Sequence, residues 1–135
     1  MKNFDIRDRD YRVSDFIKQF KGLKRVRWDN QKSCKFFESM MMCLPLHAFL
    51  IVQDKQGLYK IVDGKERIAS IIAFVNDEFP LENLEINKEL NGFTFSELYK
   101  NNFGFYANRI MDAKILIQLV FCGSEDAIPE ILKYW

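Results

Sequence analysis

The chain has 135 residues, of which 48% are hydrophobic and 29% are charged, values that indicate a folded domain and exclude a disordered chain. A formal net charge of +1 excludes a strong overall attraction to nucleic acid or to a membrane surface. The N-terminus is charged and unlike a signal sequence, and no apolar run reaches the roughly 18 residues that span a bilayer. These features predict one cytoplasmic domain over residues 1–135.

The few cysteine and histidine residues argue against metal or redox chemistry. The three cysteines, Cys34, Cys43 and Cys122, form no CxxC pair, which predicts reduced thiols in a cytosolic protein. His47 is the only histidine, and no second His or Cys cluster accompanies it. We therefore predict no metal site built by the protein alone.

The N-terminal part combines a charged segment with a short helix. Lys2–Arg12 is polar throughout and predicts a partly ordered arm. Ser14 is a suitable N-cap for a helix over Asp15–Lys21, which Gly22 ends.

A second helix is predicted over Gln31–Cys43, stopped by Pro45. Its apolar residues recur at helical spacing and define one buried face. That face comprises Cys34, Phe37, Met41 and Leu44, with Phe36 and Met40 beside it.

A β-hairpin follows the second helix. Ala48–Val52 and Leu58–Val62 are rich in β-branched and large apolar residues, and Asp54–Gly57 has turn chemistry between them. The second strand is followed directly by Asp63-Gly64, a dipeptide that strongly favours a turn.

The sequence after the third helix predicts secondary structure less clearly. Leu81–Asn91 predicts a short strand or an irregular segment. Ser96 is expected to cap a helix over Glu97–Asn101 that directs Leu98 and Tyr99 inward. Arg109–Met111 fits either an edge strand or a helix end.

The last two elements close the predicted fold. Lys114–Phe121 is the most hydrophobic run and its Ile and Val content predicts a central strand. A final helix is expected from Ser124 to Tyr134, with Pro129 delaying or kinking its start.

The candidate site lies where the hairpin enters a helix. Ile68, Ile71, Ile72 and Val75 recur at i, i+3, i+4 and i+7, which predicts one buried helix face. The residues before this face, Asp63, Gly64, Lys65, Glu66 and Arg67, then occupy the turn and the helix N-terminus. Unpaired backbone N–H groups there favour an anion. Lys65 and Arg67 add cationic donors, Gly64 lets a ligand approach the backbone, and Asp63 and Glu66 offer carboxylates.

Two structural explanations compete with this site. A strand, an Asp-Gly turn and a helix also occur in cores that bind nothing, with an ordinary solvated first turn. Upstream, a basic stretch forms either a cationic wall of the site or a solvated connector with an aromatic plug. That stretch contains Lys24, Arg25, Arg27 and Trp28.

Four segments, in this order, resemble the N-terminal domain family of GmrSD-type modification-dependent restriction systems, within the ParB/sulfiredoxin-like superfamily. The segments are LKRVRWD, SMMMCLPLHAFLIV, YKIVDGKERIASIIAF and LNGFTFSELY. The family hallmark is a strand followed by Asp-Gly-Gln-Gln-Arg and a helix. Trp28, Ser39 to Pro45, and Asn91 to Phe95 stand at other family elements, so the resemblance runs from about Val13 to Phe121.

The resemblance implies an α+β fold with a small mixed sheet, and binding or hydrolysis of a nucleoside triphosphate that controls nuclease action on phage DNA. By position, Asp63, Gly64 and Arg67 match the motif, whereas Lys65 and Glu66 replace its glutamines. Glu66 resembles the Gly-Glu-Arg-Arg element of ParB-like CTP-binding domains, and a carboxylate beside phosphates calls for Mg²⁺ between them. Lys24 or Arg25 occupies the upstream family Arg position.

We therefore expect Asp63 and Glu66 as candidate catalytic residues, and Asp63, Gly64, Lys65, Arg67, Lys24 and Arg25 as nucleotide-binding residues. The missing glutamine pair predicts weak hydrolysis or none, and one histidine excludes a His-Asn-His nuclease module. The chain stops at Trp135, where the family continues into an Arg-Leu-Asn motif. It is accordingly a standalone member, a fragment, or a subunit with a nuclease or other protein partner. The alternative function is a non-catalytic module that contacts protein or DNA.

Overall fold

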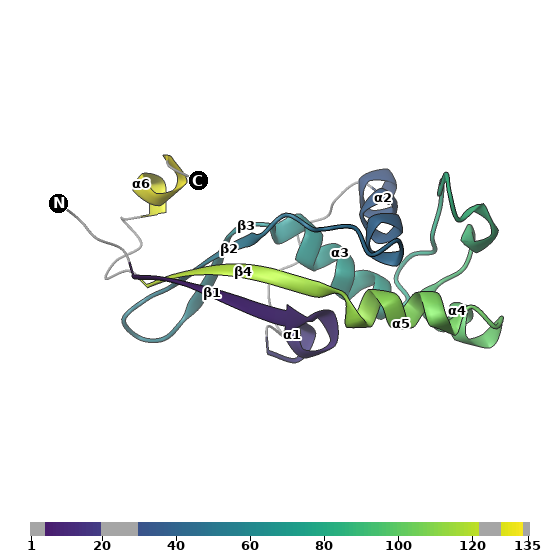
Figure 1. Cartoon of the computed structure of the whole chain (residues 1–135), viewed down its shortest axis with the longest axis horizontal. Coiled ribbons are helices and arrows are strands. Elements are labelled where there is room, and N and C mark those ends of the chain that lie inside the picture. The colour runs from purple at the N-terminus through teal and green to yellow at the C-terminus, as the bar shows by residue number, and fades with distance from the viewer. Residues whose placement is uncertain (1–4, 20–29, 122–127, 134–135) are drawn as a thin grey trace.

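The structure is a computed structural model that describes residues 5–19, 30–121 and 128–133. It confirms the predicted α+β class, with a four-stranded mixed sheet and helices around it (Figure 1). The strands are β1 (Asp5–Arg12), β2 (Phe49–Gln53), β3 (Tyr59–Asp63) and β4 (Lys114–Phe121). The helices are α1 (Val13–Gln19), α2 (Asn30–Met41), α3 (Lys65–Val75), α4 (Phe95–Lys100), α5 (Gly104–Asp112) and α6 (Ile128–Lys133), with a short 3-10 helix η1 (Lys88–Leu90).

The sheet has the strand order β1-β4-β2-β3. β4 confirms the predicted central strand with the same bounds, pairing antiparallel with β1 and parallel with β2. β2 and β3 form the predicted antiparallel hairpin. β4 lies inside the sheet, between β1 and β2. Its Ile, Leu and Val residues suit this position because they bury one face against the helices and part of the other face.

The N-terminal segment corrects one prediction. Residues 5–12, expected as part of a partly ordered arm, form strand β1 along the full length of β4. The charged residues gave no apolar alternation, so the sequence carried no strand signal there. The pairing edge that β4 offers decides the structure instead, since strand formation depends strongly on tertiary context.

Isoleucine, leucine and phenylalanine make up most of the main core. Phe16, Phe37, Phe49 and Phe74 are among the largest fully buried side chains, and the ring centroids of Phe37 and Phe74 lie 4.7 Å apart. A smaller cluster on the other face of the sheet contains Leu50, Val52, Val120 and Ile131. Ile131 belongs to α6, which lies beside the end of the sheet away from α4 and α5 (Figure 1).

Helix α2 confirms most of its predicted face. Cys34, Phe37, Met40 and Met41 are buried, but Leu44 is 50% exposed, which makes its assignment to that face wrong. The helix ends at Met41, earlier than predicted, and the chain then turns through Cys43 at φ 59°. This left-handed residue redirects the backbone, so the helical spacing no longer applies to Leu44.

Helix α4 begins earlier than the sequence predicts. Its cap is Thr94, which forms a capping box with Glu97, and not Ser96. The Ser96 hydroxyl and backbone N–H instead donate to the Asp77 carboxylate. Leu98 is buried as expected, whereas Tyr99 is 47% exposed, so the prediction that its side chain points inward is wrong.

The remaining boundaries follow the predictions with shifts of a few residues. Arg109–Met111 belongs to helix α5 and not to an edge strand. Helix α1 starts two residues before the predicted Asp15, whereas Gly22 lies outside the described residues. The expected start of the last helix at Ser124 also lies outside them, and its described part, α6, has Pro129 in the first turn.

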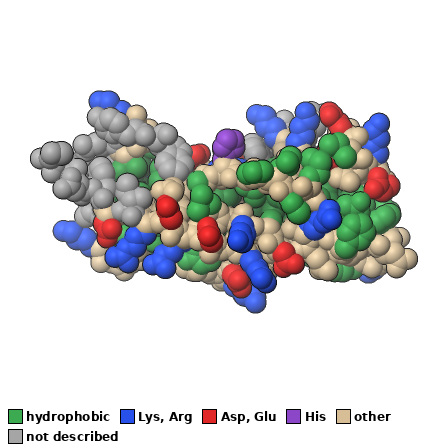
Figure 2. Space-filling model, in the orientation of Figure 1, with side chains coloured by type: hydrophobic (Ala, Val, Ile, Leu, Met, Phe, Trp, Pro, Cys, Tyr) green, Lys and Arg blue, Asp and Glu red, His purple; other side chains and the backbone are tan. Residues whose placement is uncertain are grey.

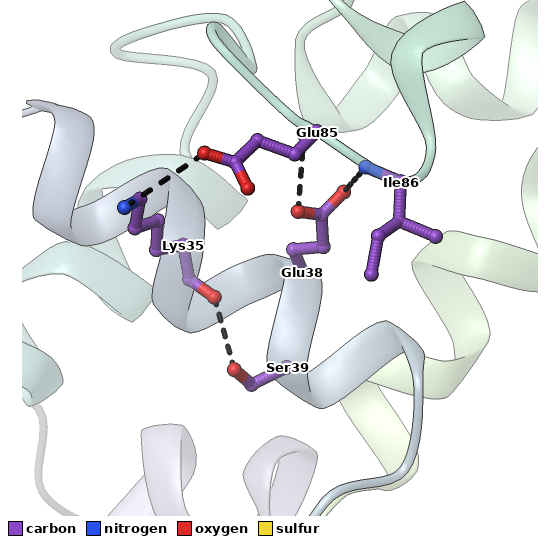
Figure 3. Close-up of polar contacts among 5 residues, drawn as sticks. All are labelled: Lys35, Glu38, Ser39, Glu85 and Ile86. Atoms are coloured by element: carbon purple, nitrogen blue, oxygen red, sulfur yellow. Dashed lines mark hydrogen bonds and ion pairs between the residues drawn. The ribbon is translucent and has the colours of Figure 1, made fainter.

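A buried carboxylate holds the irregular segment between α3 and α4. The Glu38 side chain, 6% exposed on α2, accepts hydrogen bonds from three consecutive backbone N–H groups, of which Figure 3 shows those of Glu85 and Ile86. The donors are Glu85 at 3.2 Å, Ile86 at 3.0 Å and Asn87 at 2.9 Å. The segment over residues 81–91 is thus irregular apart from η1, the second of the two predicted alternatives, and is fixed by a charge-assisted contact.

None of the helices in the described ranges is long and apolar enough to cross a bilayer.

Candidate functional site

The predicted strand–turn–helix junction is confirmed. β3 ends at Asp63, Gly64 is the N-cap residue of α3 at φ 104°, and the helix begins at Lys65. Ile68 and Ile71 are buried, and Ile72 and Val75 are half-buried against the core, so the helix has the predicted orientation. Phe74, which the predicted face did not include, is fully buried as well. The turn residues therefore lie at the end of the sheet, before the buried face begins.

Gly64 is required by packing. A Cβ atom at this position would lie 2.2 Å from Cδ1 and 2.8 Å from Cε1 of the Phe49 ring. The left-handed backbone angle independently disfavours other residues. The space that glycine leaves is thus filled by an aromatic ring from β2, and a role for Gly64 in ligand approach stays a prediction.

Arg67 connects α3 to the segment that precedes β2. Its Nη1 donates to the His47 carbonyl at 2.7 Å and its Nη2 donates to the Ala48 carbonyl at 3.4 Å. The guanidinium also lies over the Phe49 ring, 4.1 Å from the centroid, in cation–π geometry. Arg67, which is predicted to bind phosphate, therefore has a structural role in the protein itself.

The environment of Arg67 is electrostatically mixed. Burial lowers the pKa of Arg67 from its ordinary value, while the nearby Asp63 and Glu66 carboxylates raise it. The guanidinium nevertheless stays protonated near neutral pH, because arginine starts far above that range. The junction therefore holds a permanent, half-buried positive charge close to two carboxylates.

We call Phe49, Gly64 and Arg67 the Phe49 cluster. The sequence placed Phe49 in a strand but gave no sign of this contact, since Arg67 reaches back 19 and 20 residues for its carbonyl acceptors. Local periodicity reports only neighbours within a turn or two, and a packing triad between distant segments leaves no such pattern. The cluster explains two of the three motif positions without any ligand.

Other charged groups lie at the surface of the junction. Lys65 and Glu66 are exposed, and Asp63 is half-buried at the end of β3. Within the described residues, Lys65 has no hydrogen bond or ion pair, and the N-cap of α3 makes no side-chain cap bond. The exposed His47, whose backbone contacts Arg67, marks the same region on the surface (purple in Figure 2). An exposed lysine thus stands beside N–H groups that carry partial positive charge.

The predicted cationic wall lies outside the described residues. Lys24, Arg25, Arg27 and Trp28 all belong to the range 20–29. Their contribution to the site stays a prediction.

Divalent metal binding at the junction stays a prediction. No group of three or more His, Cys, Asp or Glu residues that could hold a metal occurs in the part of the chain that is described. Mg²⁺ is typically bound by one or two carboxylates plus substrate phosphates, which matches the donors offered by Asp63 and Glu66. These two residues would hold Mg²⁺ that enters with a nucleotide.

Comparison with known proteins adds no evidence about the function of this site. The chain matches no family model, no curated protein and no solved structure. The resemblance to GmrSD-type N-terminal domains therefore remains a prediction from the sequence segments that carry it.

Proposed function

We propose that the domain binds a nucleoside triphosphate at the β3–α3 junction. The observation that carries this proposal is the exposed Lys65 beside the α3 N-terminus, whose N-cap residue, Gly64, has no side chain with which to bond the first N–H groups. Backbone N–H groups and a lysine ammonium are a recurring combination for phosphate binding. In this arrangement the phosphates contact Lys65 and the first turn of α3.

In this proposal, Arg67 also binds phosphate, and Asp63 and Glu66 bind the accompanying metal ion. Arg67 has five N–H donors and uses two of them on backbone carbonyls, which leaves the others for a phosphate oxygen. Asp63 and Glu66 hold the Mg²⁺ that accompanies the nucleotide, and this removes their repulsion of the phosphates. Hydrolysis is a separate matter, because it also requires a positioned water and charge stabilisation at the γ-phosphate.

A second candidate function is a non-catalytic interaction module that kept the fold. The specific observation in its favour is the Phe49 cluster, which gives Gly64 and Arg67 a purely structural purpose. Both candidates fit the setting that the sequence resemblance implies, a phage-defence system with a nuclease or other protein partner. The net charge of +1 favours a protein partner over extended DNA contact.

A thermal-shift screen of the four nucleoside triphosphates, with and without Mg²⁺, tests the proposal. A nucleotide at about 100 times its Kd is expected to stabilise the fold by about 2.7 kcal/mol. Lys65→Ala should remove most of this stabilisation and leave the unliganded melting temperature unchanged, because the side chain has no described partner to lose. Arg67→Ala should lower the unliganded melting temperature, since it removes contacts within the Phe49 cluster.

Lys55→Ala, in the turn between β2 and β3, is the matched control for a lost surface lysine. It should leave both the melting temperature and the nucleotide response unchanged. A chain that responds to no nucleotide would favour the interaction module. A response that Lys65→Ala does not weaken would place nucleotide binding elsewhere on the protein.

A further inference from the structure

β1 forms one edge of the sheet, and no described strand pairs with its outer side. Its ladder with β4 is regular over eight residues, from Asp5 opposite Phe121 to Arg12 opposite Lys114. Proteins usually protect such an edge with a short strand, a bulge or a proline, because open backbone groups accept a further strand. β1 has none of these three devices, and its protection is its charged side chains, which disfavour any strand whose charges do not complement them.

The charges of β1 are sorted between the two faces of the sheet. Successive residues of a strand point to opposite faces, so Arg7 and Arg9 share one face while Asp8 and Asp10 share the other. The Arg7 guanidinium lies 5.1 Å from the ring centroid of Phe121 on the neighbouring strand. All four charged side chains are exposed, and Figure 2 shows basic and acidic groups intermixed along the side of the molecule where Figure 1 places β1.

This sorting disfavours a second copy of the chain as the antiparallel strand that pairs there. Two antiparallel registers about a twofold axis overlap most of β1, one centred on Asp8 and one centred on Arg9. The first places Asp8 opposite itself and Arg7 opposite Arg9, and the second places Arg9 opposite itself and Asp8 opposite Asp10. Like charges directly opposite one another destabilise a strand pair, so both registers are disfavoured.

We propose that the outer edge of β1 is a docking site for a strand of another protein that alternates acidic and basic residues. Such a strand places acidic side chains opposite Arg7 and Arg9 and basic side chains opposite Asp8 and Asp10. Main-chain hydrogen bonds to the open edge supply affinity, and the alternating charges supply register and selectivity. The proposal is independent of nucleotide binding, since β1 and β3 are the opposite edges of the sheet.

The probe is a β-hairpin peptide whose edge strand alternates Glu and Lys, titrated into the isotope-labelled full chain at low salt. Backbone amide signals of β1 should shift, and added salt should weaken the effect because the charges are exposed. A hairpin of the same composition with its charges in blocks of two should bind at least about fivefold more weakly, because half of its charges then meet like charges.

Two protein variants locate the contact. Arg9→Asp should weaken binding of the alternating hairpin about tenfold, because it replaces an attractive cross-strand pair with a repulsive one. Lys55→Asp makes the same change in net charge far from β1 in sequence and should leave binding unchanged. Asp10→Lys provides a second disruption of opposite sign and should weaken binding as Arg9→Asp does.

Four results would overturn the proposal. The alternating and blocked hairpins would bind equally well, or the signals that shift would belong to β3 instead of β1. Absence of binding at hairpin concentrations in the millimolar range would have the same meaning. Self-association of the wild-type chain that shifts the backbone amide signals of β1 would show that a second copy occupies the edge.

Discussion

Gly64→Ala is expected to lower the free energy of unfolding by about 3 kcal/mol, the sum of overpacking against a core ring and a strained left-handed backbone. The new methyl group would lie 2.2 Å from the Phe49 ring, which is fully buried and has little room to move. Chemical denaturation followed by far-ultraviolet circular dichroism measures the change.

Gly92→Ala is the matched control for this substitution. Gly92 also has a positive φ, 92°, but apart from its chain neighbours no atom of the described residues lies within 4 Å of the position of an added Cβ. Its substitution should therefore cost only backbone strain, about 1 kcal/mol. Equal losses for the two variants would contradict the role of Gly64 in making room for Phe49.

Glu38→Gln should destabilise the fold by about 2 kcal/mol, because charge-assisted hydrogen bonds at a buried site are among the stronger ones. The Glu38 carboxylate accepts from three backbone N–H groups, Oε1 from Glu85 and Oε2 from Ile86 and Asn87. A glutamine presents one oxygen, and its NH₂ group must then face at least one of these donors. Denaturant unfolding measures the loss, and faster amide exchange over residues 85–87 locates it.

Glu85→Gln is the corresponding surface control. The Glu85 side chain forms an ion pair with Lys35 at 4.0 Å, but both side chains are more than 70% exposed. Such pairs contribute between about 0 and 1 kcal/mol, so this variant should be near neutral. A Glu38→Gln protein as stable as Glu85→Gln would mean that Glu38 does not hold the segment between α3 and α4.

Elements with a strong apolar period could be predicted from sequence. The central strand Lys114–Phe121, the β2–β3 hairpin and the buried face of α3 all follow from local spacing. β1 could not be predicted, because its stability comes from pairing with β4 and not from its own charged residues. The end of α2 was misplaced because a left-handed Cys43 gives no warning in composition.

The candidate site was predicted in part. The strand–turn–helix geometry of Asp63, Gly64 and Lys65 is confirmed, since an Asp-Gly turn before an apolar helical face specifies it locally. The use of Arg67 to bind carbonyls beside Phe49 was not predicted, because that contact joins segments about 20 residues apart. A charged side chain shows its possible partners only when the fold brings them together.

Amide chemical-shift mapping with a nucleoside triphosphate and Mg²⁺ tests the central claim most directly. Nucleotide bound at the β3–α3 junction is expected to shift the backbone amide signals of Gly64, Lys65 and Glu66 first and furthest, because those N–H groups face the phosphates in the proposal. The same titration of Lys65→Ala should give smaller shifts at any given concentration. Shifts centred elsewhere in the chain, or none at millimolar nucleotide, would contradict nucleotide binding at this junction.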